Sequence, residues 1–547
     1  MKLSRSTSAA ALVAAALLLS ACGEGEAAGP AADAPVKGGE LTFAVDTEPV
    51  SFDVHVSQQD ITGTILRNVF DSLVHQDDQG GFQPWLAESW EVTDDLKTYT
   101  FKLRKDVKFT DGTAFDAEAV KANFDRIADP ATKSQLAATL LGPYGGTEVV
   151  DPHTVKVSFK QAFAPFLQAA STPYLGFYSP KTMKENGAKL GSGGAVDVGT
   201  GPFVFSAYTK GQNATFTRNP DYAWAPEGAT NAGAPYLDKL NIRFLPEASV
   251  RVGSLTSGQV HVSFALPPAD AKAVEGNSKL ALDRRDAPGA NYSIYLNAAK
   301  APLNDEKVRK AIQRGIDIDT HVKTLYFGEY KRAWSPLSPA TAPYAKALDG
   351  SWPYDQAASG KLLDEAGWTT RDSEGYRTKD GKRLTVDWPL LPASFIREKR
   401  DVLGQAFQAD LKKLGVEVKR PQGDIGTYIA TVYGGKADLA DYSWARAEPD
   451  VLWLLFNGAS KPAEGGQNAT FIDDPELTEW TDKGRSTLDK ATRDDVYTKI
   501  QQRAVELGLV IPVYTSAFTN GRSKTVGGLE YEANGWPVFQ GAWVTKK

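Results

Sequence analysis

The sequence contains a single cysteine, Cys22, in 547 residues. An internal disulfide is therefore impossible, and the chain after Cys22 offers neither a thiolate metal site nor a cysteine nucleophile. The five histidines are scattered singly, and the sequence has no Gly-x-Ser-x-Gly, His-Glu-x-x-His or Gly-x-x-x-x-Gly-Lys-Ser/Thr motif. We expect no enzyme activity, no metal and no cofactor.

The sequence also has little excess charge of either sign, since its formal net charge is only −6. That balance gives no reason to expect a nucleic acid as partner. With 42% hydrophobic and 23% charged residues, the chain has an ordinary globular composition and is long enough for two or three domains. No run after residue 22 is long and apolar enough to span a membrane.

The first residues resemble a bacterial lipoprotein signal. Lys2 and Arg5 precede an apolar run over 9–19, and Leu19-Ser20-Ala21-Cys22 follows as a lipobox-like motif. We expect a signal peptide over 1–21, a lipid on Cys22 and a flexible tether over 22–37 that is rich in Ala, Gly, Glu and Pro. The expected location is extracytoplasmic, on the membrane of a Gram-positive bacterium. An incidental cysteine in an ordinary signal peptide is the alternative.

The stretch 85–124 combines three local signals. Tyr99, Phe101 and Leu103 alternate with polar residues, which predicts a strand with one buried face. Asp111-Gly112 then predicts a turn. Asp116 is placed to cap a following helix, whose apolar positions recur at helical spacing over 120–127. The stretch therefore predicts a hairpin, a turn and a helix.

This stretch, PWLAESWEV followed by TYTFKLRKDVKFTDGTAFDAEAVKANFDRI, closely resembles the signature of the peptide/nickel family of extracytoplasmic solute-binding proteins, the receptors of ATP-driven importers. Later motifs resemble family landmarks in the same order, so the resemblance covers nearly all of the chain after Gly38. These motifs are GTGPF at 199–203, LNDEKVRKAI at 303–312, LLDEAGW at 362–368 and IPVY at 511–514.

The resemblance implies an α/β fold of the periplasmic-binding-protein type, a type II clamp with mixed sheets and an extra insertion subdomain. We expect lobe I over 38–286, with the insertion at about 54–196, lobe II over 287–515, and a return to lobe I over 516–547. Two crossing strands near Tyr292 and Tyr514 are expected to join the lobes, and such interdomain crevices favour ligand sites.

Four helices are predicted from apolar spacing. One carries Ile65, Val69 and Leu73; the second follows Asn304, which we expect to cap it; the third covers 396–414, ended by Gly415; the fourth covers 496–507.

The segment 438–450 is the most informative about the ligand. In peptide-binding relatives the matching strand ends in a tryptophan, and the loop behind it carries an aspartate that holds the ligand's ammonium group. Trp444 matches that tryptophan, but Arg446 stands where the carboxylate is expected. A guanidinium repels an ammonium group and instead binds a carboxylate or phosphate. Either Glu448 or Glu48 replaces the amine anchor, or the ligand has no free amine.

Each candidate also has a structural alternative. Arg446 is otherwise a solvated residue or an ion-pair partner of Glu448 or Asp450, and Trp444 is otherwise part of the core. Tyr442, Tyr292 and Tyr514 complete the candidate ligand-binding residues, although tyrosines in strands are often structural. A chelate-binding relative is expected to have an arginine near 172–175, and the sequence has none there.

We therefore expect a monomeric, lipid-anchored receptor that captures a di- or oligopeptide between two lobes and delivers it to a permease and ATPase complex. A same-fold receptor for an oligosaccharide, an opine-like compound or a metal chelate is the first alternative. A secreted hydrolase is the second, because paired carboxylates cannot be recognised from sequence alone. An adhesin or signalling receptor is the third.

Overall fold

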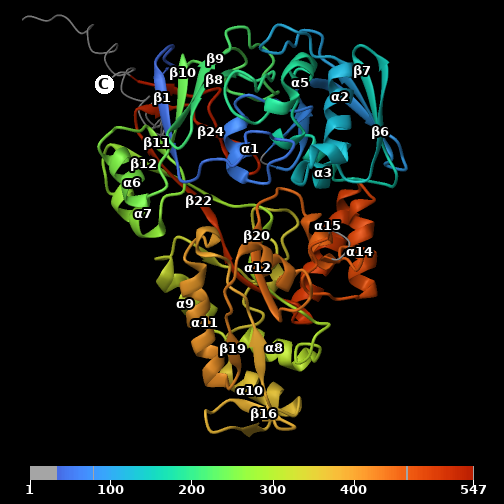
Figure 1. Ribbon diagram of the computed structural model, residues 1–547, viewed down its shortest axis with the longest axis vertical. Helices are drawn as coiled ribbons and strands as arrows, with labels where there is room; N and C mark the ends of the chain where they lie inside the picture. Colours follow the sequence, from blue (N-terminus) through green and yellow to red (C-terminus); the bar gives the residue numbers. More distant parts are fainter. Residues whose placement is uncertain (1–33, 78, 463–465, 546–547) are drawn as a thin grey trace, which may run out of the picture.

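The computed structural model describes residues 34–77, 79–462 and 466–545. The predicted signal peptide and Cys22 lie outside the described residues. The chain forms an α/β fold with two lobes, one above the other in Figure 1. None of the helices among the described residues combines the length and the apolar composition that crossing a bilayer requires.

Lobe I is built on a seven-stranded mixed sheet with the order β12-β22-β11-β1-β10-β9-β8. The central strand β1 is parallel to β10 and β11, and the other pairs are antiparallel. Its apolar face buries aromatic side chains such as Phe43, Phe205 and Phe216. The strands are β1 Glu40–Val45, β8 Phe203–Thr209, β9 Asn213–Arg218, β10 Lys239–Phe244, β11 Val262–Ser263, β12 Leu280–Asp286 and β22 Ala517–Ser523.

The insertion subdomain has its own four-stranded antiparallel sheet, ordered β4-β5-β7-β6, with α2 (Ala117–Ala128) packed on it. The predicted strand is confirmed as β5, which buries Tyr99, Phe101 and Leu103. Asp116 caps α2 by accepting a hydrogen bond from the backbone N–H of Ala119 at 2.9 Å, as predicted. The strands are β4 Ala87–Val92, β5 Thr98–Leu103, β6 Tyr144–Asp151 and β7 Thr154–Phe159.

Lobe II contains a four-stranded sheet ordered β14-β21-β13-β20, surrounded by helices. A short parallel pair, β18 (Thr385–Asp387) and β19 (Glu417–Lys419), extends it away from lobe I. The sheet strands are β13 Ala290–Leu296, β14 Lys331–Arg332, β20 Leu439–Trp444 and β21 Val510–Thr515. The helices are α8 Glu306–Arg314, α9 Ile318–Leu325, α10 Gln356–Glu365, α11 Arg400–Leu414, α12 Ile425–Val432, α13 Val451–Phe456, α14 Pro475–Arg485 and α15 Lys490–Glu506.

Two chain segments cross side by side between the lobes. β12 pairs with β22 in lobe I, and β13 pairs with β21 in lobe II, with Tyr292 opposite Tyr514. Between these pairs the N–H of Ala287 donates to the carbonyl of Ser516 at 2.8 Å. A paired connection of this kind resists sliding of the lobes while leaving a hinge at 287–289 and 516.

The four helices predicted from apolar spacing all differ from the observed ones. The fourth, α15, begins at Lys490, six residues before the predicted start at 496, because Asp489 caps it by accepting from the Thr492 N–H. The helix α1 (Asp60–Leu66) stops before Val69 and Leu73, because the carbonyls of Asn68 and Val69 accept backbone hydrogen bonds from the segment 201–203 instead of continuing the helix. Asp305, not Asn304, caps α8. α11 begins at Arg400, since the two preceding residues adopt left-handed backbone conformations. Gly415 ends α11 in the left-handed conformation, as predicted.

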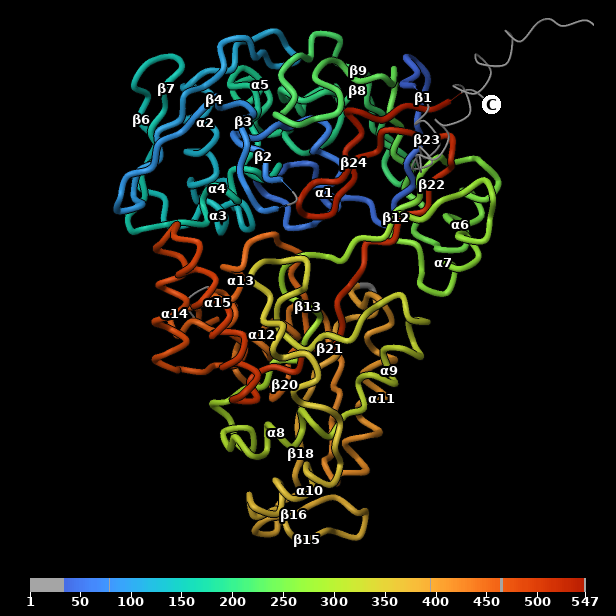
Figure 2. The backbone as a smooth tube through the Cα atoms, turned by 180° about the vertical axis from the view of Figure 1, so that it is seen from behind, coloured from blue at the N-terminus to red at the C-terminus, as the bar shows by residue number. Residues whose placement is uncertain are grey.

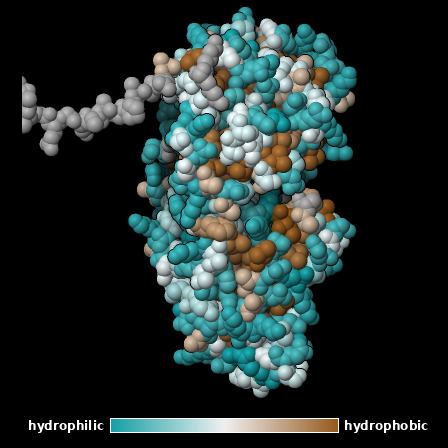
Figure 3. All heavy atoms as spheres, turned by 90° about the vertical axis from the view of Figure 1, so that its left-hand side faces the viewer, coloured by the Kyte–Doolittle hydropathy of each residue, from teal (hydrophilic) through white to brown (hydrophobic). Residues whose placement is uncertain are grey.

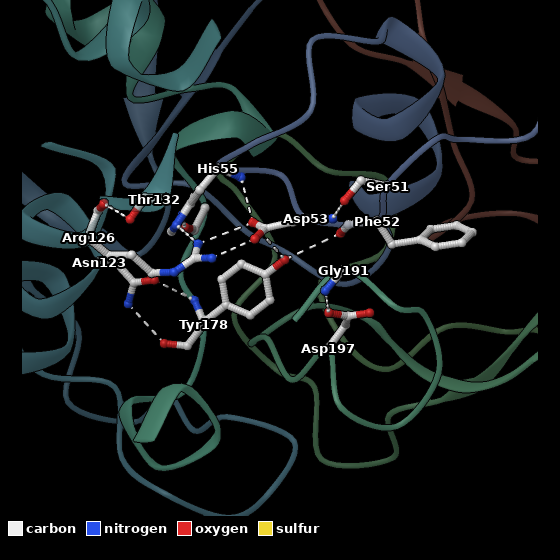
Figure 4. Close-up of polar contacts among 11 residues, drawn as sticks. Ser51, Phe52, Asp53, His55, Asn123, Arg126, Thr132, Tyr178, Gly191 and Asp197 are labelled. Carbon is white, nitrogen blue, oxygen red and sulfur yellow. Dashed lines mark hydrogen bonds and ion pairs between the residues drawn. The ribbon is translucent and has the colours of Figure 1, made fainter. Parts of the chain in front are cut away.

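A buried polar cluster ties the insertion subdomain to the segment after β1 (Figure 4). Arg126 of α2 donates to both carboxylate oxygens of Asp53, at 3.1 and 2.5 Å, and to Nδ1 of His55 at 2.7 Å. The other ring nitrogen of His55 lies 2.8 Å from the carbonyl of Gly176. Tyr178 lies over the guanidinium, with its hydroxyl 3.4 Å from Asp53. These hydrogen bonds join α2 to the segment 53–55 and to the loop that carries Gly176, so the cluster acts as a structural joint.

The joint makes a prediction about acid stability. Burial, followed by the Arg126 charge, lowers the pKa of His55 from 6.5 to about 4. Between pH 6.5 and 4 the unfolded chain binds a proton at this position and the folded protein does not. Folding stability should therefore fall as the pH drops through this window, by up to about 3 kcal/mol. Urea titrations from pH 7 to 4 should show a shallower loss for His55→Gln. An unchanged pH slope in that variant would contradict the assignment.

Candidate functional site

The two lobes approach each other along one edge, between the insertion subdomain and the α13–α14 region of lobe II. The N–H of Ala164 donates to the carbonyl of Arg485 at 2.8 Å, and the Arg485 guanidinium lies 5.4 Å from the ring centre of Phe163. A cavity of about 30 Å³ remains there, which has room for water but not for a solute. Figure 3 shows apolar side chains gathered where the lobes meet.

The loop after β20 brings two predicted residues to this boundary. Trp444 ends β20, and its buried Nε1–H has no hydrogen-bond acceptor among the described residues. The Arg446 guanidinium lies 5.0 Å from the centre of the Trp444 ring. Burial lowers the pKa of Arg446, while the carboxyl of Asp60 in lobe I acts in the opposite direction. The Arg446 guanidinium thus forms a cation–π contact with Trp444 and lies near enough to lobe I to interact with the charge of Asp60.

Hinge backbone packs directly against this loop. Gly289 has a φ of +91°, and a Cβ atom built there would come within 2.1 Å of the Trp444 carbonyl oxygen and 2.5 Å of the Arg446 nitrogen. Only glycine fits this left-handed, crowded position. Its N–H donates to Oγ1 of Thr341 at 2.6 Å, and its carbonyl accepts from Ser338 at 2.8 Å. The loop that presents Arg446 is therefore packed on the first crossing segment.

The carboxylate opposite Arg446 is Asp60, in the first turn of α1. Asp60 has an exposed surface in this structure. The protein atoms around its carboxyl nevertheless desolvate it, and this desolvation raises its pKa. The charges of Arg397 and Arg446 counter that rise. No ion pair joins Asp60 to either arginine among the described residues. One carboxylate of lobe I and two guanidiniums of lobe II thus influence one another electrostatically across the boundary without forming an ion pair among the described residues.

Arg397 directly precedes a turn of two residues with left-handed backbone conformations. Glu398 and Lys399 both have positive φ angles, 54° and 53°, a conformation that is costly for residues other than glycine and is often found at functional sites. Glu398 is anchored from both sides, because its carbonyl accepts from the Tyr326 hydroxyl at 2.7 Å and its carboxylate accepts from Arg400 at 2.7 Å. These bonds hold the turn that places Arg397.

Glu448 and Glu48 are both already engaged, so neither is a free amine anchor. Glu448 forms an ion pair with Arg493, and burial raises its pKa. Glu48 lies at the β8–β9 hairpin, where it accepts from the Tyr208 hydroxyl and the Gly211 N–H, both at 2.7 Å. Both predicted alternatives for the amine anchor therefore have partners within the protein.

Tyr292 and Tyr514 lie inside lobe II, and Tyr442 is half-buried against the core of that lobe. Tyr292 and Tyr514 are 1% and 0% exposed and pack against each other with ring centres 4.8 Å apart. Arg400 lies 4.2 Å from the Tyr292 ring centre and donates to the Tyr514 hydroxyl at 3.0 Å. Tyr442 stacks on Tyr295, and its hydroxyl donates to the carbonyl of Gln467. The tyrosines support the Arg397 turn and the β20 strand from within the core.

The described residues contain no group of three or more His, Cys, Asp or Glu side chains suited to a metal ion. Sequence reasoning missed Asp60 and Arg397. No local sequence pattern singles out Asp60, and Arg397 lies within the helix predicted over 396–414. Only the approach of the two lobes brings their charges together.

Comparison with known proteins gives a consistent result. A family model described as bacterial extracellular solute-binding proteins, family 5 middle, matches residues 81–465. The glutathione-binding protein GsiB of Escherichia coli K12 is 26% identical over 501 residues, which cover 89% of this chain and 91% of GsiB.

Solved structures agree in fold. NikA from Brucella suis, in complex with Fe(III)-EDTA, superposes with a TM-score of 0.80 at 25% identity, covering 93% of this chain and all of NikA. The oligopeptide-binding protein AppA from Bacillus subtilis, in complex with a nonapeptide, gives 0.77 at 22% identity, covering 94% of this chain and all of AppA.

Proposed function

The chain belongs to family 5 of the bacterial extracellular solute-binding proteins, and on that premise we propose that it captures a short peptide between its two lobes. Membership makes it the extracytoplasmic substrate-binding protein of an ABC transporter, and a binding protein instead of an enzyme. What the proposal adds is the ligand class and the residues that recognise it.

The opposition of Asp60 to Arg446 and Arg397 carries the proposal. A peptide is a zwitterion, whose ammonium group suits a carboxylate and whose carboxylate suits a guanidinium. Two arginines against one aspartate favour a peptide with one amine and two carboxylates. The name of the GsiB relative supports this choice, since glutathione has that charge pattern.

Peptide binding would also explain closure. A ligand that bridges Asp60 in lobe I and Arg446 in lobe II gains both contacts only when the lobes are together, so it favours the closed form. We propose that the permease and ATPase complex recognises this form of a monomeric receptor. Trp444 forms one wall of the site, beside Arg446.

The test is a comparison of matched dipeptides by isothermal titration calorimetry. We expect Ala-Glu to bind more tightly than Ala-Ala, and Ala-Ala more tightly than Ala-Lys. Glutathione should bind in the range of Ala-Glu. Fe(III)-EDTA and an opine serve as non-peptide competitors. Tight binding of either of these, with no binding of any peptide, would reject the peptide assignment and leave the family-level function intact.

We further propose that Cys22 carries a lipid that anchors the protein to the outer face of the membrane of a Gram-positive host. The sequence Leu19-Ser20-Ala21-Cys22 supports this assignment. Two or more acyl chains give a stable anchor because each buried methylene contributes about 0.8 kcal/mol. Metabolic labelling with a radioactive fatty acid should mark the native protein and not Cys22→Ser; an unlabelled native protein would exclude the anchor.

A further inference from the structure

The loop that carries Arg446 is hydrogen-bonded to lobe I through its own backbone. The N–H of Ala447 donates to Oδ1 of Asn534 at 3.2 Å. Ala447 directly follows Arg446 in lobe II. Asn534 lies in lobe I, in the turn between β24 (Glu530–Tyr531) and β25 (Pro537–Val538), which pair as an antiparallel hairpin. A hydrogen bond between groups of different lobes can form only when the lobes are together.

The β24–β25 hairpin is fixed firmly to the rest of lobe I. Across its turn, the N–H of Glu532 donates to the carbonyl of Trp536 at 3.0 Å. The Glu532 carboxylate accepts from Arg67 Nε at 2.9 Å, in an ion pair that is largely buried. Arg67 also donates to the carbonyls of Phe70 and Ser171, at 3.2 and 2.6 Å. Because breaking a buried ion pair is costly, the hairpin moves together with lobe I.

The same hairpin packs on α1, the helix that carries Asp60. Trp536 is buried, and a Cβ atom at Gly63 of α1 would come within 2.7 Å of its ring. Trp536 also contacts the ring of Tyr174, whose hydroxyl donates at 2.9 Å to the backbone carbonyl of the residue before α1. Figure 2 shows the hairpin beside α1, on the side of lobe I that faces lobe II. Asn534 and Asp60 therefore belong to one rigid unit.

The loop after β20 is fixed in a similar way within lobe II. Gly289 of the hinge packs closely against its backbone at Arg446, and Glu448 forms an ion pair with Arg493 of α15. The Ala447 N–H lies between these two points of attachment. A movement of the lobes that brings Asn534 to this N–H therefore also brings α1 and its Asp60 towards Arg446.

We propose that Asn534 is a positioning residue that serves as a latch for closure. Its amide oxygen binds the Ala447 N–H in the closed form, and both groups bind water when the lobes part. The inference rests on the proposed function, because the latch assembles the site between Asp60 and Arg446. One net hydrogen bond changes the ratio of closed to open molecules by about fivefold. This contribution is made by the protein alone and adds to that of the ligand.

Pulsed electron paramagnetic resonance on the full chain measures this ratio directly. Spin labels on Glu148→Cys of the insertion sheet and Glu479→Cys of α14, both at exposed positions, report the distance between the lobes. Cys22→Ser removes the one native cysteine. With no peptide added, Asn534→Ala should lower the ratio of closed to open molecules by about fivefold. Asn534→Asp keeps an oxygen acceptor and should retain the ratio of the unmodified protein.

A kinetic measurement gives a second readout with Ala-Glu as the probe. Because the latch acts after the ligand has bound, Asn534→Ala should raise the dissociation rate by about fivefold and leave the association rate nearly unchanged. Stopped-flow tryptophan fluorescence measures both rates. If Ala-Glu does not bind, the peptide proposal fails, while the distance measurement without peptide still decides whether the latch exists.

Glu530→Gln is the matched control, since Glu530 lies on the same hairpin at the end away from the turn. It should change neither readout, and circular dichroism verifies that each variant folds. A distance distribution for Asn534→Ala equal to that of the unmodified protein would overturn the proposal. An equal shift in Glu530→Gln or in Asn534→Asp would also overturn it, because the effect would then come from disturbing the hairpin and not from losing the acceptor.

Discussion

Arg446→Gln is expected to lower the affinity for a free dipeptide such as Ala-Glu by about 100-fold. The physical reason is that the guanidinium has no ion-pair partner among the described residues, so in the proposed complex the ligand carboxylate supplies its strong acceptor. Removing one partner of a desolvated charge pair costs about 2–5 kcal/mol. Calorimetry with matched peptides measures the loss.

Chemical changes in the ligand make the assignment specific. The loss caused by Arg446→Gln should largely disappear with the peptide amide Ala-Ala-NH2, which has no carboxylate, whereas it should persist with Ala-Ala. Asp60→Asn should show the converse behaviour: a large loss for Ala-Ala and little loss for its N-acetyl form. Arg104→Gln is the control, since Arg104 pairs with Asp106 on the surface of the insertion subdomain. Equal losses for free and blocked peptides would remove both residues from ligand recognition.

Arg126→Met is expected to be the most destabilising of the substitutions considered, by about 3–5 kcal/mol, because it leaves the Asp53 carboxylate buried without its guanidinium. Asp53 is 4% exposed, so water cannot replace the lost bonds. Urea unfolding followed by tryptophan fluorescence measures the change, and hydrogen exchange in α2 should increase most.

Two further variants show whether the charge is the cause. Adding Asp53→Asn to Arg126→Met should recover much of the lost stability, because the buried position is then neutral. Arg218→Met breaks an exposed pair with Asp238 and should cost less than about 1 kcal/mol. If Arg126→Met cost no more than Arg218→Met, the cluster would not be the joint that holds the insertion subdomain.

Local patterns predicted much of the fold. Alternation at Tyr99, Phe101 and Leu103 identified β5, and Asp116 and Gly415 act as helix cap and helix stop because these effects depend on neighbours a few residues away. The prediction that a helix continues through Val69 was wrong for a reason that is not local. The backbone carbonyl of Val69 accepts a hydrogen bond from the N–H of Gly201, which lies 132 residues further along the chain. Propensity cannot anticipate a competing partner at that separation.

The residues of the proposed ligand site were predictable only in part. The resemblance located Trp444 and Arg446, since they lie in one recognisable segment. It could not show that Glu448 is paired with Arg493 or that Glu48 accepts from Tyr208, since those partners are 45 and 160 residues away. Tyr292 and Tyr514 were correctly placed in strands next to the crossings, but strand alternation does not tell which side faces the ligand and which the lobe II core.

The central claim is that a zwitterionic solute is held between the lobes, with its amine on Asp60 and its carboxylate on Arg446. A crystal structure of the complex with Ala-Glu, or with the ligand that native mass spectrometry finds on the purified protein, tests this most directly. We predict ligand density that joins Asp60 of lobe I to Arg446 of lobe II. Ligand density that contacts only one lobe, with both Asp60 and Arg446 beyond hydrogen-bonding distance of the ligand, would contradict the account.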